Sequence, residues 1–166
     1  MNFATQLLSV ARKLAIEPSD EALQASLRRS LSTTYYALFH LLVEEAARRL
    51  VPSSPPGLRS RVSRTFVHNE VNKVCGQFSK QLNPDLKALL PAGVPDDLRL
   101  VAETFSQLQQ VRHRADYDPD FVTIRSFALL RFNEAERAFS AWQRVSSSEE
   151  ANVFLTALAF GARWSK

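Results

Sequence analysis

Apolar residues recur at three- and four-residue steps along nearly the whole chain, and no convincing run alternates with a period of two. This spacing places apolar side chains on one face of an α-helix, whereas a half-buried strand would alternate. The chain is therefore expected to be all-α. Six helices are predicted, near residues 3–15, 20–50, 63–82, 95–117, 122–144 and 149–162, with one short turn around 86–90.

Proline and capping residues predict the helix boundaries. Proline ends the first helix, and Ser19 and Asp20 then offer side-chain oxygens to cap the second. Residues 52–57 hold three prolines and a glycine and form the clearest linker. Ser147 and Glu150 have the spacing of a capping box ahead of the last helix. The residues expected to be buried include Leu27, Leu31, Tyr35, Val67, Val71, Val74, Phe78, Phe127, Leu130, Ala135, Ala138 and Trp142.

Length and composition favour one domain in a reducing compartment. At 166 residues with 45% hydrophobic content, residues 1–166 can bury one core of ordinary size, with 149–163 as an appended helix. A single cysteine, Cys75, excludes an internal disulfide framework. The longest apolar stretch, residues 151–161, is roughly half of the ~20 residues that a membrane span needs. The first six residues do not resemble a secretory signal, so we expect a cytoplasmic protein without a membrane segment.

Positive charge gathers in the middle third of the chain. The formal net charge is +4, yet between Arg48 and Lys80 there are seven basic residues and one acidic residue, Glu70. A phosphate-bearing partner would use such a local excess. A solvated loop rich in arginine explains the same pattern, so charge alone does not decide between the two.

Two short strings carry residues that could bind or react. One runs from Arg28 to His40 and reads Arg-Arg-Ser-Leu-Ser-Thr-Thr-Tyr-Tyr-Ala-Leu-Phe-His; the other, Arg-His-Arg-Ala-Asp-Tyr, runs from Arg112 to Tyr117. At this separation they resemble the signatures of the HEPN family, in its branch of small bacterial helical bundles. His68 falls where that branch often has a histidine. The likeness spans about residues 20–145 and leaves the final helix outside it.

The resemblance implies an antiparallel bundle of about five helices, to which this chain adds an extra C-terminal helix. It also implies binding to RNA or a nucleotide, frequent formation of a homodimer, and a partner protein such as a nucleotidyltransferase or an antitoxin. Some members of the family cut RNA with an arginine and a histidine on a late helix. Counting back from Tyr117, those positions hold Gln110 and Ala115, which favours a non-catalytic or weakly catalytic member.

The second string has a structural and a functional interpretation. Arg112 and Asp116 are four residues apart, so their side chains can pair on one helix face. The pair would fix the junction with the following turn, while Tyr117 packs against the second helix. Alternatively, Arg112, His113 and Arg114 reach a phosphate, since arginine suits bidentate phosphate contacts. We prefer the structural interpretation.

The first string offers a similar choice. Tyr35 continues the apolar stripe of the second helix and is expected in the core. Tyr36 and His40 are one turn apart on an adjacent face, where they could line a groove in which a base stacks. Such an aromatic stripe is more often a surface for helix packing, which is the interpretation we prefer here.

In the middle third, Arg61 and Arg64 are the candidates for phosphate binding. Arg61 and His68 are seven residues apart and would share a face if one helix held both. A proton-transfer role for His68 or His113 therefore stays open. The three histidines and one cysteine show no metal-ligand spacing, and no Gly-rich phosphate loop follows a strand, so neither a metal nor a cofactor is expected.

Three functions follow from these patterns. The first is a HEPN-like component of a bacterial toxin–antitoxin or defence module that interacts with nucleic acid or nucleotide. The second is a metal-independent ribonuclease that uses His68 or His113 with nearby arginines. The third is a protein-interaction module that docks through its apolar C-terminal helix.

Overall fold

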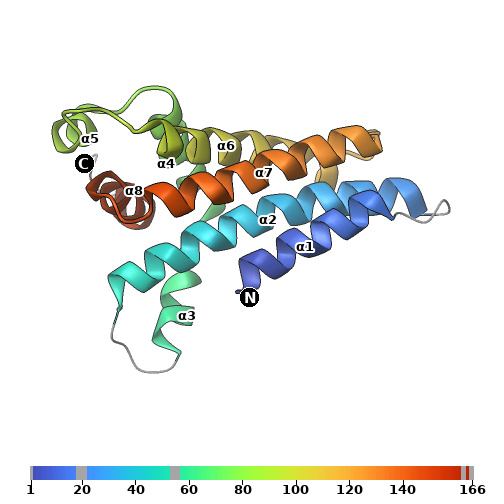
Figure 1. Cartoon of the computed structure of the whole chain (residues 1–166), viewed down its shortest axis with the longest axis horizontal. Coiled ribbons are helices and arrows are strands. Elements are labelled where there is room, and N and C mark those ends of the chain that lie inside the picture. The colour runs from blue at the N-terminus through green and yellow to red at the C-terminus, as the bar shows by residue number, and fades with distance from the viewer. Residues whose placement is uncertain (1, 18–21, 53–56, 162–163, 165–166) are drawn as a thin grey trace. The chain divides into compact units, whose positions relative to one another are not determined.

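The computed structural model describes residues 2–17, 22–52, 57–161 and 164, which form eight α-helices and no strand (Figure 1). The prediction of an all-α bundle is therefore confirmed. The helices are α1 (Phe3–Ile16), α2 (Leu23–Leu50), α3 (Leu58–Ser63), α4 (His68–Ser79), α5 (Pro84–Leu89), α6 (Asp96–Tyr117), α7 (Arg125–Val145) and α8 (Glu149–Phe160). Six of them correspond to the six expected helices, α5 takes the place of the expected short turn, and α3 is additional. None of the helices in the described ranges is long and apolar enough to cross a membrane.

The middle of the chain differs most from the prediction. The helix expected to begin near Ser63 begins only at His68, as α4, and the additional helix α3 precedes it and ends at Ser63. Between them, β-branched Thr65 and Val67 have low helix propensity. Val67 has an extended backbone and is 58% exposed, so its predicted burial was wrong.

Two smaller predictions also need correction. Leu130 is exposed on α7, because the buried stripe of that helix instead holds Ala128, Phe132, Ala135 and Ala138. The cap of α8 is Ser148, whose side chain accepts a hydrogen bond from the Ala151 N–H, and not Ser147. The predicted caps Ser19 and Asp20 lie outside the described residues.

The chain divides into two compact units. The first comprises residues within Met1–Leu41 and Thr104–Phe139, and the second comprises residues within Leu42–Glu103 and Ser140–Lys166. Helices α2, α6 and α7 contribute residues to both units. The assignment of residues 1–166 to one domain stays a prediction, and each unit is described below by itself.

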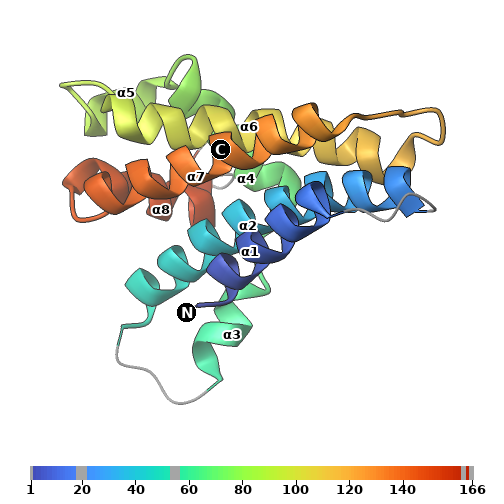
Figure 2. The same cartoon turned by 45° about the vertical axis from the view of Figure 1, so that its right-hand side comes forward.

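In the first unit, α1 and the first part of α2 run antiparallel, side by side in both views (Figures 1 and 2). The Ser30 hydroxyl donates a 2.7 Å hydrogen bond to the Ala11 carbonyl, and the rings of Phe3 and His40 lie 4.9 Å apart. The start of α1 therefore lies beside the later residues of this part of α2, and the end of α1 lies beside the earlier ones. Tyr35 is fully buried, as predicted. The core also contains Leu27, Leu31, Leu38, Phe105, Leu108, Ala115, Phe121 and Ala128.

In the second unit, α8 packs on α4. The rings of Phe78 on α4 and Phe154 on α8 are 4.8 Å apart at a steep angle, and Trp142 of α7 lies 6.4 Å from Phe154. The Cβ that Gly161 lacks would lie 3.3 Å from the Val74 side chain, so the end of α8 approaches α4 closely. The chain itself therefore covers the apolar face of α8. The docking interpretation of this helix stays a prediction, since its packing on α4 does not test whether a partner binds.

We expect Phe154→Ala to lower the free energy of unfolding by about 3–5 kcal/mol, because it leaves a cavity among packed aromatic rings. Urea denaturation followed by circular dichroism measures the change. Phe160→Ala on the same helix is the matched control, and because Phe160 is 37% exposed its effect should stay below about 1 kcal/mol. Equal losses for the two variants would contradict the packing of α8 on α4.

Candidate functional site

Polar side chains recur at four-residue steps along one face of α2 in the first unit. They are Gln24, Arg28, Ser32 and Tyr36. Each contacts the C-terminal part of α6 or the loop that follows it. Four residues are slightly more than one helical turn, so a single stripe of α2 meets successive parts of its partner. These contacts explain why the polar residues of the first string lie within a helix that is otherwise largely buried.

Arg28 makes the most extensive contacts of this stripe. Its Nε donates to the Ala115 carbonyl at 2.8 Å, and its Nη2 donates to the Asp118 carbonyl at 2.7 Å. Its Nη1 lies 3.4 Å from the carbonyls of Pro119 and Phe121. The last carbonyls of a helix have no partner within the helix, and a cation there also suits the helix dipole. Arg28 therefore fixes the end of α6 and the loop beyond it.

Gln24 fixes the same loop one turn earlier on α2. Its Nε2 donates to the Thr123 carbonyl at 2.9 Å, and its Oε1 accepts from the Thr123 N–H at 3.1 Å. The amide thus satisfies both main-chain groups of one loop residue, as a neighbouring strand would. The sequence alone gives no role to Gln24 or Arg28, since their partners are main-chain groups 87 to 99 residues away.

Arg112 is the centre of the other half of the stripe. Its Nε lies 2.8 Å from Asp116 Oδ2, and its Nη2 donates to the Tyr36 hydroxyl at 2.8 Å. The Ser32 hydroxyl donates to the same Asp116 oxygen at 3.2 Å. The Arg112 side chain is 15% exposed. Burial alone would lower the pKa of Arg112, but the hydrogen bond with Tyr36 and the nearby Asp116 and Tyr117 outweigh it and raise this pKa.

The predicted pairing of Arg112 with Asp116 is thus confirmed. The predicted packing of Tyr117 against α2 is wrong, because Tyr117 is 63% exposed. Its ring instead faces the Arg112 guanidinium at 5.3 Å and lies 5.2 Å from the His113 ring. The Arg112 guanidinium is already paired with a carboxylate and two phenols, which favours its structural interpretation over phosphate binding.

His40 is half-buried and packs between two aromatic rings. Phe3 of α1 lies 4.9 Å from it and Phe39 lies 5.6 Å from it, both edge to face. Burial lowers the pKa of His40 below its usual value, so the imidazole is neutral near pH 7. Since Tyr36 contacts Arg112, both members of the proposed base groove take part in contacts within the unit. These contacts favour helix packing.

His113 and Arg114 are the exposed candidates of the first unit. Both lie on the last turns of α6. The Arg114 guanidinium stands 4.6 Å over the Phe121 ring in a cation–π contact, and the residue as a whole is exposed. The nearby acids Asp116, Asp118 and Asp120 offset the positive charge of this end of the helix, so it is a weak electrostatic site for an anion.

The second unit contains Arg61, Arg64 and His68. Arg61 belongs to α3, Arg64 caps its C-terminal end, and His68 begins α4. The helical-face argument that joined Arg61 to His68 is therefore wrong, since the two lie on different helices. Arg61 and Arg64 are both exposed. Neither forms an ion pair with any part of the chain that the structure describes.

Other basic residues of the second unit already have partners. Arg48 pairs with Glu45 at 2.7 Å, and Lys73 pairs with Glu70 at 2.9 Å. Arg49 donates to the carbonyl of Ser146. Arg59 donates to the carbonyls of Val51 and Pro52. Of the cations that gave the middle third its charge, Arg61 and Arg64 are thus among those left for another molecule.

Neither the Cys75 thiol nor a cluster of metal-ligating side chains offers a reactive centre in the described residues. Cys75 is fully buried, and burial raises the pKa of its thiol, so it is an inert core residue. Within the described ranges, no group of three or more His, Cys, Asp and Glu side chains could hold a metal ion.

Comparison with known proteins finds no family model that matches the chain. No curated protein and no solved structure is significantly similar to it either. Membership of the HEPN family therefore stays a prediction, which rests on the two sequence strings.

We expect Arg28→Met to lower the free energy of unfolding by about 2–3 kcal/mol, because it removes charge-assisted hydrogen bonds to several carbonyls. Arg29→Met is the matched control, since Arg29 is the exposed neighbour and loses the same charge. Urea denaturation measures both, and amide hydrogen exchange of residues 118–123 should rise only in Arg28→Met. An equal loss of unfolding free energy in the two variants would contradict the structural role of Arg28.

We expect Tyr36→Phe to cost about 1.5–3 kcal/mol of unfolding free energy, since the lost hydroxyl accepts a hydrogen bond from a charged group. Tyr117→Phe should cost less than about 0.5 kcal/mol, because its hydroxyl is 3.5 Å from the same Arg112 nitrogen and its ring is exposed. A double-mutant cycle with Arg112→Met isolates each coupling. A coupling to Tyr117 as large as that to Tyr36 would contradict the geometry.

Proposed function

We propose that this protein is a HEPN-like, non-catalytic component of a cytoplasmic bacterial toxin–antitoxin or defence module, and that it contacts the phosphates of RNA through α3. Arg61 and Arg64 are the contacting residues in this proposal. Formation of a homodimer and association with a nucleotidyltransferase or an antitoxin belong to the same proposal.

The main support for RNA binding through α3 is that the guanidinium groups of Arg61 and Arg64 are exposed. They project from a short helix and its cap, and no ion pair joins either of them to a described residue. No aspartate or glutamate occurs between Glu45 and Glu70, so no acid of the same segment opposes them. The guanidinium of arginine can donate two parallel hydrogen bonds to one phosphate group. Contacts with phosphates supply most of the sequence-independent affinity of proteins for nucleic acid.

Binding is supported better than cleavage. The arginine and histidine positions of RNA-cutting relatives hold Gln110 and Ala115 here. Arg112, the arginine beside His113, is paired with Asp116 and Tyr36. A catalytic arginine needs a guanidinium that can turn toward the reacting phosphate, so a paired Arg112 is poorly suited to that role.

The proposal predicts that Arg61→Ala combined with Arg64→Ala weakens binding of a labelled single-stranded RNA about tenfold or more at low salt. Fluorescence anisotropy across a salt series measures it, and each lost phosphate contact should lower the salt slope by about 0.7. Arg125→Ala combined with Arg137→Ala is the control, since it removes two exposed arginines of α7 and the same charge. The affinity of this control variant for the RNA should stay near that of the unmodified protein.

Equal weakening by both double variants would mean that net charge alone drives binding, and it would contradict the role of α3. The same RNA incubated with a chelator should remain intact. Cleavage that disappears in His68→Ala or His113→Ala would replace this proposal with the metal-independent ribonuclease.

A further inference from the structure

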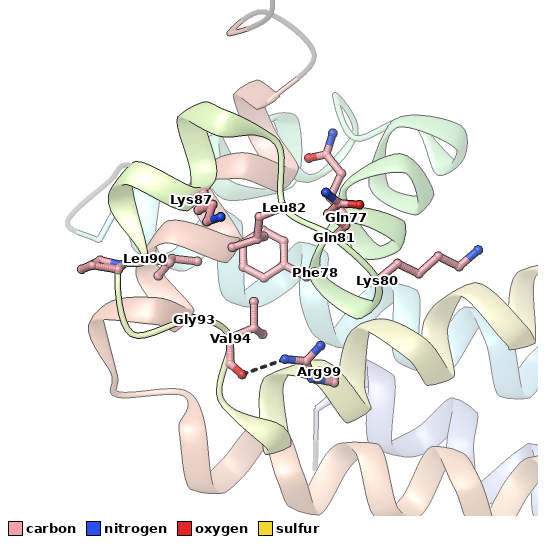
Figure 3. Close-up of a pocket in the computed structure, with 11 residues that line it drawn as sticks. Gln77, Phe78, Lys80, Gln81, Leu82, Lys87, Leu90, Gly93, Val94 and Arg99 are labelled. Carbon is pink, nitrogen blue, oxygen red and sulfur yellow. Dashed lines mark hydrogen bonds between the residues drawn. The ribbon is translucent and has the colours of Figure 1, made fainter.

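A cavity of about 240 Å³ opens in the second unit (Figure 3). The last turn of α4, the loop after it, helix α5, the loop before α6 and the first turns of α6 form its walls. It is lined by none of the residues proposed above for RNA binding or cleavage. Its lining combines an apolar floor with positive charges, and no aspartate or glutamate is part of the lining.

Local sequence chemistry builds these walls. Asn83 caps α5 by accepting a 2.8 Å hydrogen bond from the Leu86 N–H, with Pro84 at the start of the helix. After α5, Gly93 has a φ of +85°, which other residues rarely adopt and which turns the chain back toward α6. Because Leu86 and Leu90 are buried, α5 is anchored on the unit.

The floor of the cavity is apolar. Leu82 and Val94 line it and are partly exposed, whereas Phe78 is fully buried and Leu90 is 4% exposed, so these two lie mostly beneath its surface. Figure 3 shows Leu82 and Val94 beside the Phe78 ring, and these two partly exposed side chains form the accessible part of the floor. A flat or aliphatic group could pack against these side chains, as apolar parts of ligands do in preformed pockets.

Two cations stand on different walls of this floor. Lys87 comes from α5 and Arg99 from α6, and Figure 3 shows them on opposite sides of the Phe78 ring. The Arg99 guanidinium donates a long, 3.4 Å hydrogen bond to the Val94 carbonyl. Among the described ion pairs of this unit, none includes Lys87 or Arg99. Lys80 also lines the cavity, but its side chain is directed away from the ring.

We propose that this cavity binds a small phosphate monoester whose organic part is apolar. A phosphate monoester carries nearly two negative charges at neutral pH, which matches one lysine and one arginine that no lining acid neutralises. The volume lies below the range of about 300–1,000 Å³ typical of sites for drug-sized ligands, so the apolar part is about the size of one ring. This site is separate from Arg61 and Arg64, and the inference does not depend on RNA binding.

Isothermal titration calorimetry of the full chain with phenyl phosphate tests the proposal, with inorganic phosphate, phenol and benzoate as comparison ligands. Phenyl phosphate should bind more tightly than each of the other three, because it alone combines a ring with a dianion. Lys87→Ala and Arg99→Ala should each weaken it about tenfold, the factor expected for one lost charge-assisted contact. Both residues are exposed, and circular dichroism verifies that the variants keep their helices.

Lys73→Ala is the matched control, since Lys73 is an exposed cation of α4 outside the cavity, and it should leave phenyl phosphate binding unchanged. Absence of binding, or equal weakening by Lys73→Ala, would overturn the site. If inorganic phosphate bound as tightly as phenyl phosphate, the apolar floor would make no contribution and the proposal would be wrong. If benzoate bound as tightly, the site would not be specific for phosphate and the proposal would also be wrong. The Lys87 and Arg99 variants should keep the RNA affinity of the unmodified protein, so the two proposals fail separately.

Discussion

The contacts of the Arg28 guanidinium set the geometry of the first unit. Two short hydrogen bonds join it to the carbonyls of Ala115 and Asp118, at the point where α6 ends and its last carbonyls would otherwise lack partners. Gln24, one turn earlier, binds both main-chain groups of Thr123. Together they hold the turn between α6 and α7 against α2. With that turn fixed, Ala115 and Phe121 remain in the core.

The same stripe gives a physical meaning to the two sequence strings. Ser32 and Tyr36 from the first string meet Asp116 and Arg112 from the second. Residues of these types at these spacings are therefore needed to join two helices, whatever the unit binds. A resemblance based on them supports a shared packing arrangement more directly than a shared chemistry.

The sequence predicted the helices well because their periodicity is local. The stripes of α2 and α6, the break before α6 and the pair Arg112–Asp116 all depend on residues a few positions apart. It failed where a local preference was weak, as between α3 and α4, where Val67 fits the apolar period but has an extended backbone. It could not find the role of Arg28, because the partners of this residue are carbonyls of a distant turn. The cavity beside Phe78 was missed for the same reason, since its walls come from separate helices.

The number of basic residues in a segment does not tell which of them can bind an anion. The contacts that each basic residue already makes within the protein tell more. If Arg28 turned toward a phosphate, carbonyls at the end of α6 would lose their donor, at about 1–3 kcal/mol for each buried group left unsatisfied. Arg112 would likewise leave Asp116 and Tyr36. Exposed Arg61, Arg64, Lys87 and Arg99 have no such partners among the described acids. An anion that binds them gains their charge without weakening the helix contacts, which is why the proposed sites lie in the second unit.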